Sequence, residues 1–162
     1  MRKAIYSLFV VYTLIIFCQC DKNYPKDFEE IPWGINIEQL KENLDQKNIA
    51  YEIKSEDAGE YIQTYGTFFG IENTQIRFYF KKNKFYMGYV GIHRNIEYFD
   101  EIGKEIEALI IYNDNKYKEH HYVGSKDEVS YFWVFKNYYI EITSKLFLDN
   151  WINVRIIYRK GN

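Results

Sequence analysis

The chain has 162 residues, a formal net charge of −2 at pH 7, and aromatic residues at 20% of its positions. This length suits one domain with a hydrophobic core. The mild acidity, without a basic stripe along the sequence, argues against a nucleic-acid surface, so we expect no nucleic-acid partner. Strands favour aromatic residues, so part of the aromatic excess indicates sheet structure.

The first twenty residues are typical of an export signal. Arg2 and Lys3 precede an apolar run from Ala4 to Phe17, which is short for a membrane span of about 20 residues. The run closes on Phe17-Cys18-Gln19-Cys20. This ending resembles a bacterial lipoprotein signal, in which the cysteine after the cleavage site becomes the lipidated first residue. The resemblance implies a signal peptide over residues 1–19.

Cys20 is the expected site of lipid attachment. Both cysteines of the chain lie at this junction, and no later cysteine can pair with Cys20 in a disulfide. Several acyl chains, such as palmitate, would hold the protein on a bilayer nearly permanently. We therefore expect an exported lipoprotein anchored to a membrane of the cell envelope and facing the periplasm or the exterior. An uncleaved anchor helix and a freely secreted protein are the alternatives.

After the anchor, a polar and charged stretch over residues 20–30 is expected to be a tether, and an α+β domain is expected over residues 31–162. In the opening Ile31-Pro32-Trp33-Gly34, we expect Trp33 to fill the gap between a helix and a sheet. Gly34 allows a φ that other residues resist. Asn36 and Gln39 have the spacing of a capping box, which predicts that a helix begins here.

Alternating apolar and polar residues predict strands in the rest of the first half. The clearest pair is a hairpin around Lys82-Asn83. A two-residue turn there would place Phe80 opposite Phe85 and Phe78 opposite Met87, which makes one face apolar throughout. The expected strands are Tyr51–Lys54, Tyr61–Gly70, Gln75–Lys81 and Lys84–His93.

The order of a helix followed by strands then occurs a second time. A helix is expected over Tyr98–Tyr112, and a shift of 62 residues places Leu40 on Ile102 and Leu44 on Ile106. A shift of 64 residues lays residues 73–78 on residues 137–142. We therefore predict an α+β fold in which two similar halves (31–96 and 97–160) share one curved antiparallel sheet with helices on one face. The later strands are expected at Tyr117–Val123, Val129–Lys136, Tyr138–Ser144 and Trp151–Arg159.

Two family resemblances rest on this plan. The opening Ile31-Pro32-Trp33-Gly34-Ile35-Asn36 and the closing strands near Tyr139-Ile140-Glu141-Ile142 resemble those of small uncharacterised bacterial lipoproteins. The doubled plan resembles β-lactamase-inhibitory protein, whose two α+β repeats form one long sheet with a concave binding face. That resemblance implies the architecture and not the target, because this chain has no disulfides within each half.

The sequence offers little for catalysis or metal binding, so we expect no enzyme, no metal and no cofactor. His120 and His121 would point to opposite faces of a strand. Glu119 and His121 would supply two ligands, fewer than a zinc site needs. The adjacent acidic pairs Glu29-Glu30, Glu56-Asp57 and Asp100-Glu101 are expected in solvated loops and at helix starts, because sequence neighbours rarely oppose each other across a substrate.

A binding face is the favoured functional interpretation. If Ile76, Phe78 and Phe80 face the helices, the residues between them face away, and tyrosine and arginine dominate the energetics of protein interfaces. We expect a non-enzymatic envelope lipoprotein that binds a protein partner, as an inhibitor or an immunity factor. The alternatives are a glycan- or peptidoglycan-binding module and a scaffold for envelope assembly. The candidate partner-binding residues are Arg77, Tyr79, Tyr86, Tyr139, Glu141 and Arg155. Trp133, in a row with Tyr131 and Phe135, is expected to be buried between the sheet and the helices.

Overall fold

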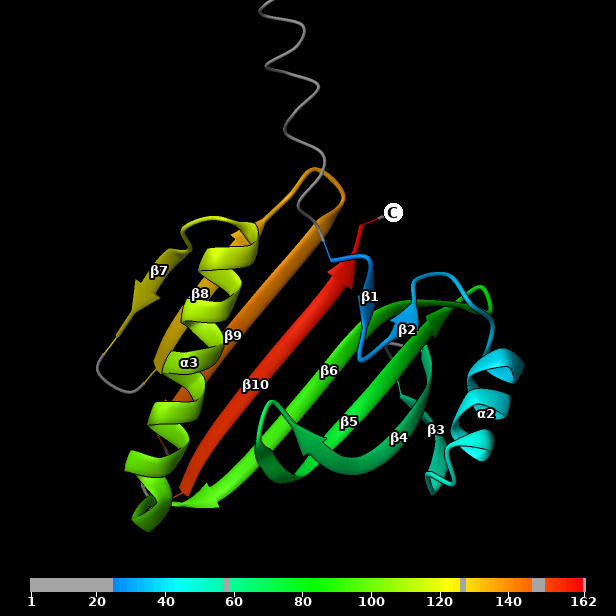
Figure 1. Cartoon of the computed structure of the whole chain (residues 1–162), viewed down its shortest axis with the longest axis horizontal. Helices are drawn as coiled ribbons and strands as arrows, with labels where there is room; N and C mark the ends of the chain where they lie inside the picture. The colour runs from blue at the N-terminus through cyan, green and yellow to red at the C-terminus, as the bar shows by residue number, and fades with distance from the viewer. Residues whose placement is uncertain (1–24, 57–58, 126–127, 147–150, 162) are drawn as a thin grey trace, which may run out of the picture.

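The computed structural model describes residues 25–56, 59–125, 128–146 and 151–161. The predicted signal peptide over residues 1–19, Cys20 and the first part of the expected tether lie outside the described residues. Among the described residues, eight strands form one antiparallel sheet in the spatial order β3-β4-β5-β6-β10-β9-β8-β7 (Figure 1). The two helices of the described part complete an α+β fold, which confirms the predicted class.

The strands follow the chain in two runs, and the last strand of each run lies at the centre of the sheet. β6 pairs with β10 in an antiparallel ladder, so the two runs meet along this one line. The strands of the first run are β3 (Tyr51–Glu56), β4 (Gly59–Phe68), β5 (Ile71–Lys81) and β6 (Lys84–Asn95). Those of the second run are β7 (His121–Gly124), β8 (Glu128–Val134), β9 (Tyr138–Leu146) and β10 (Trp151–Lys160).

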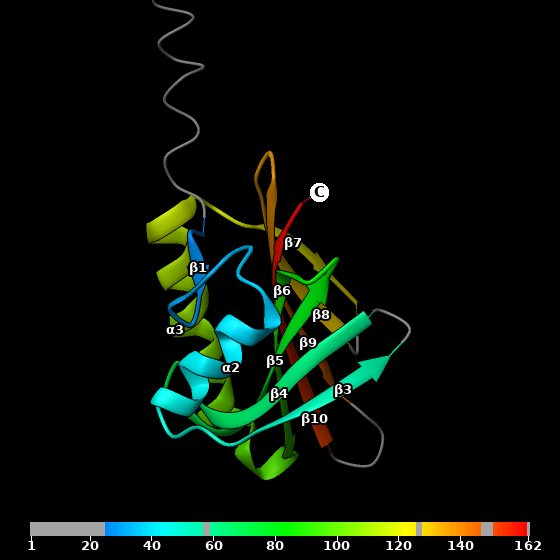
Figure 2. The same cartoon turned by 90° about the vertical axis from the view of Figure 1, so that its right-hand side faces the viewer.

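Each run of strands is preceded by a helix, α2 (Ile37–Gln46) or α3 (Phe99–Tyr117), the latter following a short 3₁₀ turn η2 (Ile96–Tyr98). Figure 2 shows α2 and α3 on the same side of the sheet. Leu40 and Leu44 of α2 and Ile102, Ile106 and Leu109 of α3 belong to one hydrophobic core with the strand residues beneath them. Burial of these two stripes holds both helices on the sheet.

The start of α2 is as predicted. The side-chain oxygen of Asn36 accepts a hydrogen bond from the backbone N–H of Gln39 at 2.8 Å, and the side-chain oxygen of Gln39 accepts one from the backbone N–H of Asn36 at 3.0 Å. The ring of Trp33 stacks on Phe85 of β6 with 4.8 Å between centroids. Gly34 has a φ of 88°, in the region that favours glycine.

The end of the expected tether is part of the fold. β1 (Asp27–Phe28) and β2 (Ile31–Pro32) form a two-stranded hairpin on the helix side of the sheet (Figures 1 and 2). The Phe28 side chain is only 2% exposed and belongs to the core. The folded part therefore begins before residue 31. A single phenylalanine in a charged stretch has no periodicity, so the sequence pattern did not indicate this anchor.

The register of the β5–β6 hairpin differs from the prediction by one residue beyond the turn. Phe80 pairs with Phe85 as expected, but a bulge next to Tyr79 then places Phe78 opposite Gly88 instead of Met87. Gly88 leaves a gap in the apolar face, and the ring of Phe28 fills that gap, because a Cβ atom at Gly88 would overlap with the ring. The bulge and the buried Phe28 are thus two parts of one packing arrangement.

α3 is longer than predicted. It continues from Tyr112 to Tyr117 because Asn113 and Tyr117 extend the buried stripe of Ile102, Ile106 and Leu109 at helical spacing. Because Asn113 is polar, a hydrophobicity pattern does not indicate that the helix continues past Tyr112. As a result, the strand expected over Tyr117–Val123 is reduced to β7.

Trp133 is buried between the sheet and α3, as predicted. Its indole N–H donates a hydrogen bond to Asp114 of α3 at 3.0 Å, so the polar edge of the buried ring has a partner. Tyr131 and Phe135, in the same row, are partly buried and pack against the same core.

Candidate functional site: the open face of the sheet

The side of the sheet opposite α2 and α3 is the candidate binding surface. In β5, Ile76 and Phe78 face the helices, so Arg77 and its alternate neighbours face away. Neither described helix lies on that side (Figure 2). We call this surface the open face. Strand pairing assigns to it Tyr61, Gln63 and Tyr65 of β4, Gln75, Arg77 and Tyr79 of β5, Tyr89 and His93 of β6, Trp151, Asn153 and Arg155 of β10, and Tyr139, Glu141 and Thr143 of β9.

Arg77 is the centre of an aromatic cluster in the first half of the open face. Its guanidinium donates a hydrogen bond to the hydroxyl of Tyr79 at 3.1 Å and is 3.3 Å from a carboxylate oxygen of Glu56. It also lies over the rings of Tyr61 and Tyr89, 5.0 Å and 5.3 Å from their centroids. Tyr61 donates to Glu56 at 2.9 Å. Cation–π and charge-assisted contacts therefore fix Arg77 from several sides.

Glu141 is the centre of a second cluster, in the second half of the open face. Its carboxylate accepts hydrogen bonds at 2.7 Å from each of Tyr139, Thr143 and Arg155. Partial burial alone would raise the pKa of Glu141, but the hydrogen bonds from Thr143, Tyr139 and Arg155 lower it below the usual carboxyl value. Burial and the bond to Glu141 raise the pKa of Tyr139. At neutral pH this cluster therefore holds an ionised glutamate and a neutral tyrosine.

Tyr61 and Tyr89 of the first cluster were not among the predicted binding residues, and neither were three further aromatic residues of the open face. Tyr65 is 63% exposed, and its hydroxyl accepts hydrogen bonds from Gln63 and Gln75. The rings of His93 and Trp151 stack face to face, with centroids 4.4 Å apart and planes 2° apart. These residues come from β4, β6 and β10. Because they meet only through strand pairing, an alternation pattern within one strand could indicate their face but not their neighbours.

The predicted binding residues have different surroundings. Arg77 and Tyr79 join the first cluster, whereas Tyr139, Glu141 and Arg155 form the second. Tyr79 is only 5% exposed, so it supports Arg77 and offers little surface to a partner. Tyr86 lies apart from both clusters, with the guanidinium of Arg159 6.0 Å from its ring centroid.

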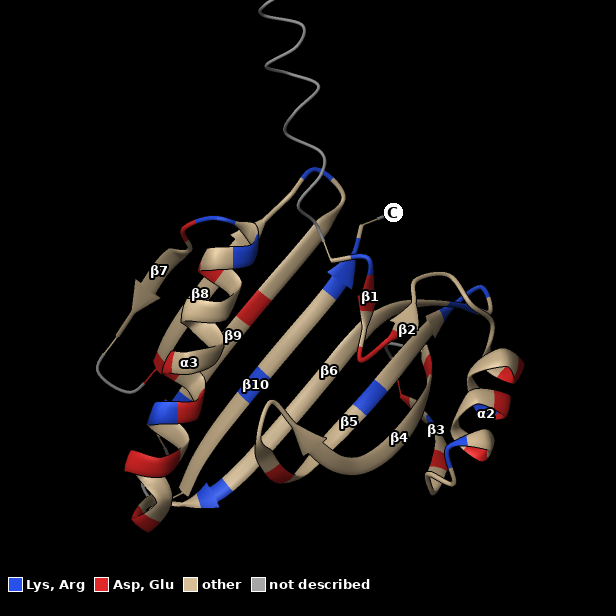
Figure 3. Ribbon diagram, in the orientation of Figure 1, with Lys and Arg blue, Asp and Glu red and all other residues tan. Residues whose placement is uncertain are grey.

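Charged residues are sparse on the central strands. Figure 3 shows isolated charged positions on β5, β10 and β9, and a denser distribution of charge on the helices. Arg77 and Glu141 are already paired with neighbouring side chains, and strand pairing adds exposed charged residues such as Lys54 and Lys145 toward the edges. The accessible part of the open face therefore combines aromatic, neutral polar and charged side chains. Such a surface is typical of protein interfaces and of aromatic platforms for sugars.

The described residues contain no group of three or more His, Cys, Asp or Glu side chains that could hold a metal ion. His120 is paired with Asp114 at 3.1 Å, and Glu56 belongs to the Arg77 cluster. Glu29 and Glu30 occupy the β1–β2 turn, and Asp100 and Glu101 lie in the first turn of α3. Within the same residues, no helix has the length and apolar character needed to cross a membrane.

No family model, no curated protein and no solved structure matches this chain. The resemblances to small bacterial lipoproteins and to β-lactamase-inhibitory protein therefore stay predictions.

Proposed function

We propose that this chain is a non-enzymatic lipoprotein of the cell envelope that binds a protein partner through the open face. The observation that carries the proposal is the asymmetry of the sheet. α2 and α3 both lie on one side, while the other side presents tyrosine, tryptophan and arginine side chains. These residue types supply most of the binding energy at protein interfaces.

Preorganisation supports a binding role for this surface. Arg77 and Glu141 are held by neighbouring side chains before any partner arrives, so little side-chain freedom would be lost on association. Tyr65 and Arg155 stay exposed and would make the direct contacts. A broad, rigid face that covers its partner suits an inhibitor or an immunity factor, which acts by occlusion and needs no reactive group.

We also infer that the two halves are copies of one unit, a helix followed by four strands. Residues 66 positions apart occupy equivalent pairs: Gln75 pairs with Gly91 and Glu141 with Ile157. The same shift relates Val90 to Ile156, and these two residues pair with each other at the centre of the sheet. A local two-fold axis through that pair would relate β6 to β10 and α2 to α3. This arrangement supports the doubled plan expected from the sequence.

Glycan binding is the second candidate. The flat stack of His93 and Trp151 and the exposed ring of Tyr65 are suited to packing against sugar rings. Retention on insoluble peptidoglycan, lost in a Trp151→Ala variant, would favour this candidate over a protein partner.

Two substitutions on the open face should weaken capture of a protein partner. We expect the double variant Tyr65→Ala/Arg155→Ala to reduce recovery of a partner from envelope extract at least tenfold, since each interface anchor contributes about 1–2 kcal/mol. The partner would be identified by mass spectrometry and its affinity measured with purified protein. Tyr98→Ala, which removes an exposed tyrosine before α3, is the matched control and should leave capture unchanged. Equal loss in both variants, or in neither, would count against the open face.

The anchor is tested separately. A palmitate analogue supplied to growing cells should label the wild-type chain and the Cys18→Ala variant but not Cys20→Ala, because only Cys20 is expected to carry acyl groups. The labelled protein should be recovered with membranes. Label retained in Cys20→Ala, or full-length chain dissolved in the cytosol, would contradict the lipoprotein assignment without affecting the fold.

A further inference from the structure

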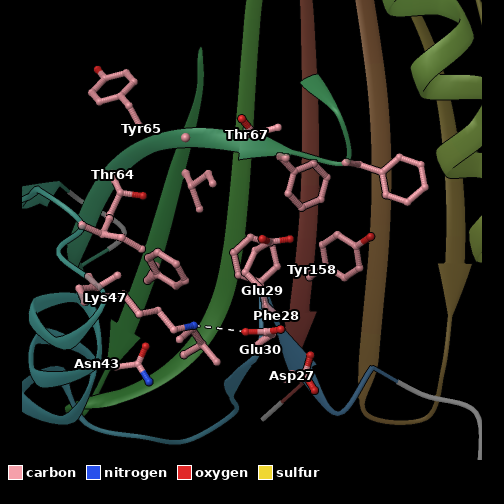
Figure 4. Close-up of a pocket in the computed structure, with 18 of the residues that line it drawn as sticks. Asp27, Phe28, Glu29, Glu30, Asn43, Lys47, Thr64, Tyr65, Thr67 and Tyr158 are labelled. Atoms are coloured by element: carbon pink, nitrogen blue, oxygen red, sulfur yellow. Dashed lines mark hydrogen bonds and ion pairs between the residues drawn. The ribbon is translucent and has the colours of Figure 1, made fainter. Parts of the chain in front are cut away.

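The helix side of the sheet contains a cavity of about 700 Å³, which lies between α2, the β1–β2 hairpin, β4 and α3 (Figure 4). This volume falls in the range of small-molecule sites, roughly 300–1,000 Å³. Most of its lining lies on the helix side of the sheet, and it meets the open face only where Tyr65 of β4 belongs to both. Its walls are mainly aromatic and aliphatic and include Phe28, Leu44, Phe68, Phe78, Leu109 and Tyr158.

Two consecutive glutamates in the β1–β2 turn line this cavity. Glu29 and Glu30 have φ angles of 52° and 64°, in the left-handed region that glutamate rarely adopts. Tight hairpin turns of this kind normally use asparagine and glycine. This backbone conformation brings both carboxylates to a cavity whose lining combines aromatic rings with the charged residues Asp27, Lys47 and Lys116 (Figure 4). Unfavourable conformations of this sort are frequent at binding sites.

Three other charged side chains at the cavity have partners, whereas Glu29 and Asp27 have none among the described residues. Glu30 is paired with Lys47 of α2 at 3.2 Å. The ammonium of Lys116 in α3 donates to the Tyr112 hydroxyl at 2.8 Å and lies over the rings of Tyr112 and Tyr117. No hydrogen bond or ion pair connects Glu29 to any described residue.

The environment of Glu29 is unfavourable to its negative charge. Figure 4 shows Glu29 beside Phe28 at the edge of the cavity, and the residue as a whole keeps an exposed surface. Partial burial, together with the nearby Glu30 and Asp27, raises the pKa of Glu29 above the usual carboxyl value, although Lys47 counteracts part of this effect. A cation placed beside this carboxylate would relieve both the desolvation and the repulsion.

We propose that this cavity binds an organic cation with an apolar body, such as an alkyl or aryl amine. The ammonium or guanidinium group lies against Glu29, and the apolar body packs against the ring-lined walls. The binding site differs from the proposed protein interface, because most of its lining lies on the helix side of the sheet, although the two share Tyr65.

Three probes with one apolar body and different head groups test this site: 4-phenylbutylamine, 4-phenylbutanoate and 4-phenylbutan-1-ol. Each is titrated at pH 7 into the full-length chain in detergent micelles, and backbone amide shifts are followed at Gly66 and Thr67, which line the cavity. We expect the amine to bind at least tenfold more tightly than either analogue. Glu29→Gln should reduce its affinity to that of the alcohol. Glu107→Gln, an exposed acid of α3 outside the cavity lining, should leave it unchanged.

A second variant keeps the test decisive if Glu29→Gln folds poorly. A Cβ atom at Gly66 would meet only Ile76 Cδ1, at 3.9 Å, and Gly66 does not have a left-handed backbone. Leucine at this wall position should therefore occupy the cavity without backbone strain, so Gly66→Leu should abolish amine binding. Tighter binding of the carboxylate, equal binding of all three probes, no binding of any probe, or unchanged binding by Gly66→Leu would overturn the proposal.

Discussion

Replacing Phe85 with alanine should lower the free energy of unfolding by about 3–5 kcal/mol, the range for large-to-small changes at buried aromatic positions. The Phe85 side chain is only 1% exposed. Its ring contacts those of Trp33, Phe78 and Phe80, with centroids 4.8 Å, 5.7 Å and 6.0 Å away. The variant therefore leaves a cavity where the segment before α2 meets the sheet.

The backbone of Phe85 also holds this segment. Its N–H donates to the carbonyl of Ile35, and its carbonyl accepts from the N–H of Gly34, both at 2.9 Å. These bonds survive the substitution, so the loss measured by denaturant unfolding reports the ring alone. Phe99→Ala, at an exposed phenylalanine of α3, should change stability by no more than about 0.5 kcal/mol. A loss below about 1 kcal/mol for Phe85→Ala would mean that the segment does not pack as described.

Adding one methyl group at Gly88 should also be costly. The Cβ atom of Gly88→Ala would overlap with the Phe28 ring, so the β1–β2 hairpin would have to shift. Overpacking of this kind costs about 1–3 kcal/mol. Gly103→Ala is the control, because Gly103 lies inside α3, just after its first turn, and a Cβ atom there meets no described atom within 4 Å. We expect that substitution to stabilise the protein by about 0.5–1 kcal/mol.

A double-mutant cycle attributes the effect of Gly88→Ala to Phe28. In a Phe28→Ala background the ring is absent, so adding the methyl group at Gly88 should cost little. The cycle should therefore give a coupling energy of about 1–2 kcal/mol between the two sites, measured from chemical unfolding curves. Equal costs in both backgrounds would show that Phe28 does not sit over Gly88 in solution, and the β1–β2 hairpin would then be misplaced.

Local features of this fold could be predicted from the sequence, because a few neighbouring residues determine them. The capping box of Asn36 and Gln39 and the stripe of Leu40 and Leu44 are examples. The bulge beside Tyr79 could not be predicted in this way. It places Gly88 opposite Phe78, where Phe28, about fifty residues earlier in the chain, fills the gap above the glycine. Neither the bulge nor the burial of Phe28 produces a recognisable pattern in the sequence. The sequence therefore predicted an ideal hairpin and a longer tether.

The candidate site, like the fold, could be predicted from the sequence only in part. Alternation along β5 and β9 was enough to place Arg77 and Glu141 on the side away from the helices. It could not show that Tyr61 packs on Tyr79 with centroids 4.8 Å apart, or that Glu56 reaches Arg77 from β3. Those contacts cross strands, and they explain why Tyr79 is buried although its alternation predicts an outward side chain.

Site-specific photo-crosslinking in living cells tests most directly whether the open face is the binding surface. A photoreactive amino acid would replace Tyr65 or Asn153 on the open face. In the comparison set it would replace Tyr98 of η2 or Ile111 of α3, which are both exposed. We predict a discrete crosslinked protein from the open-face positions and none from the comparison positions. Crosslinks from Tyr98 or Ile111 alone would contradict the account and would move the interface to the helix side.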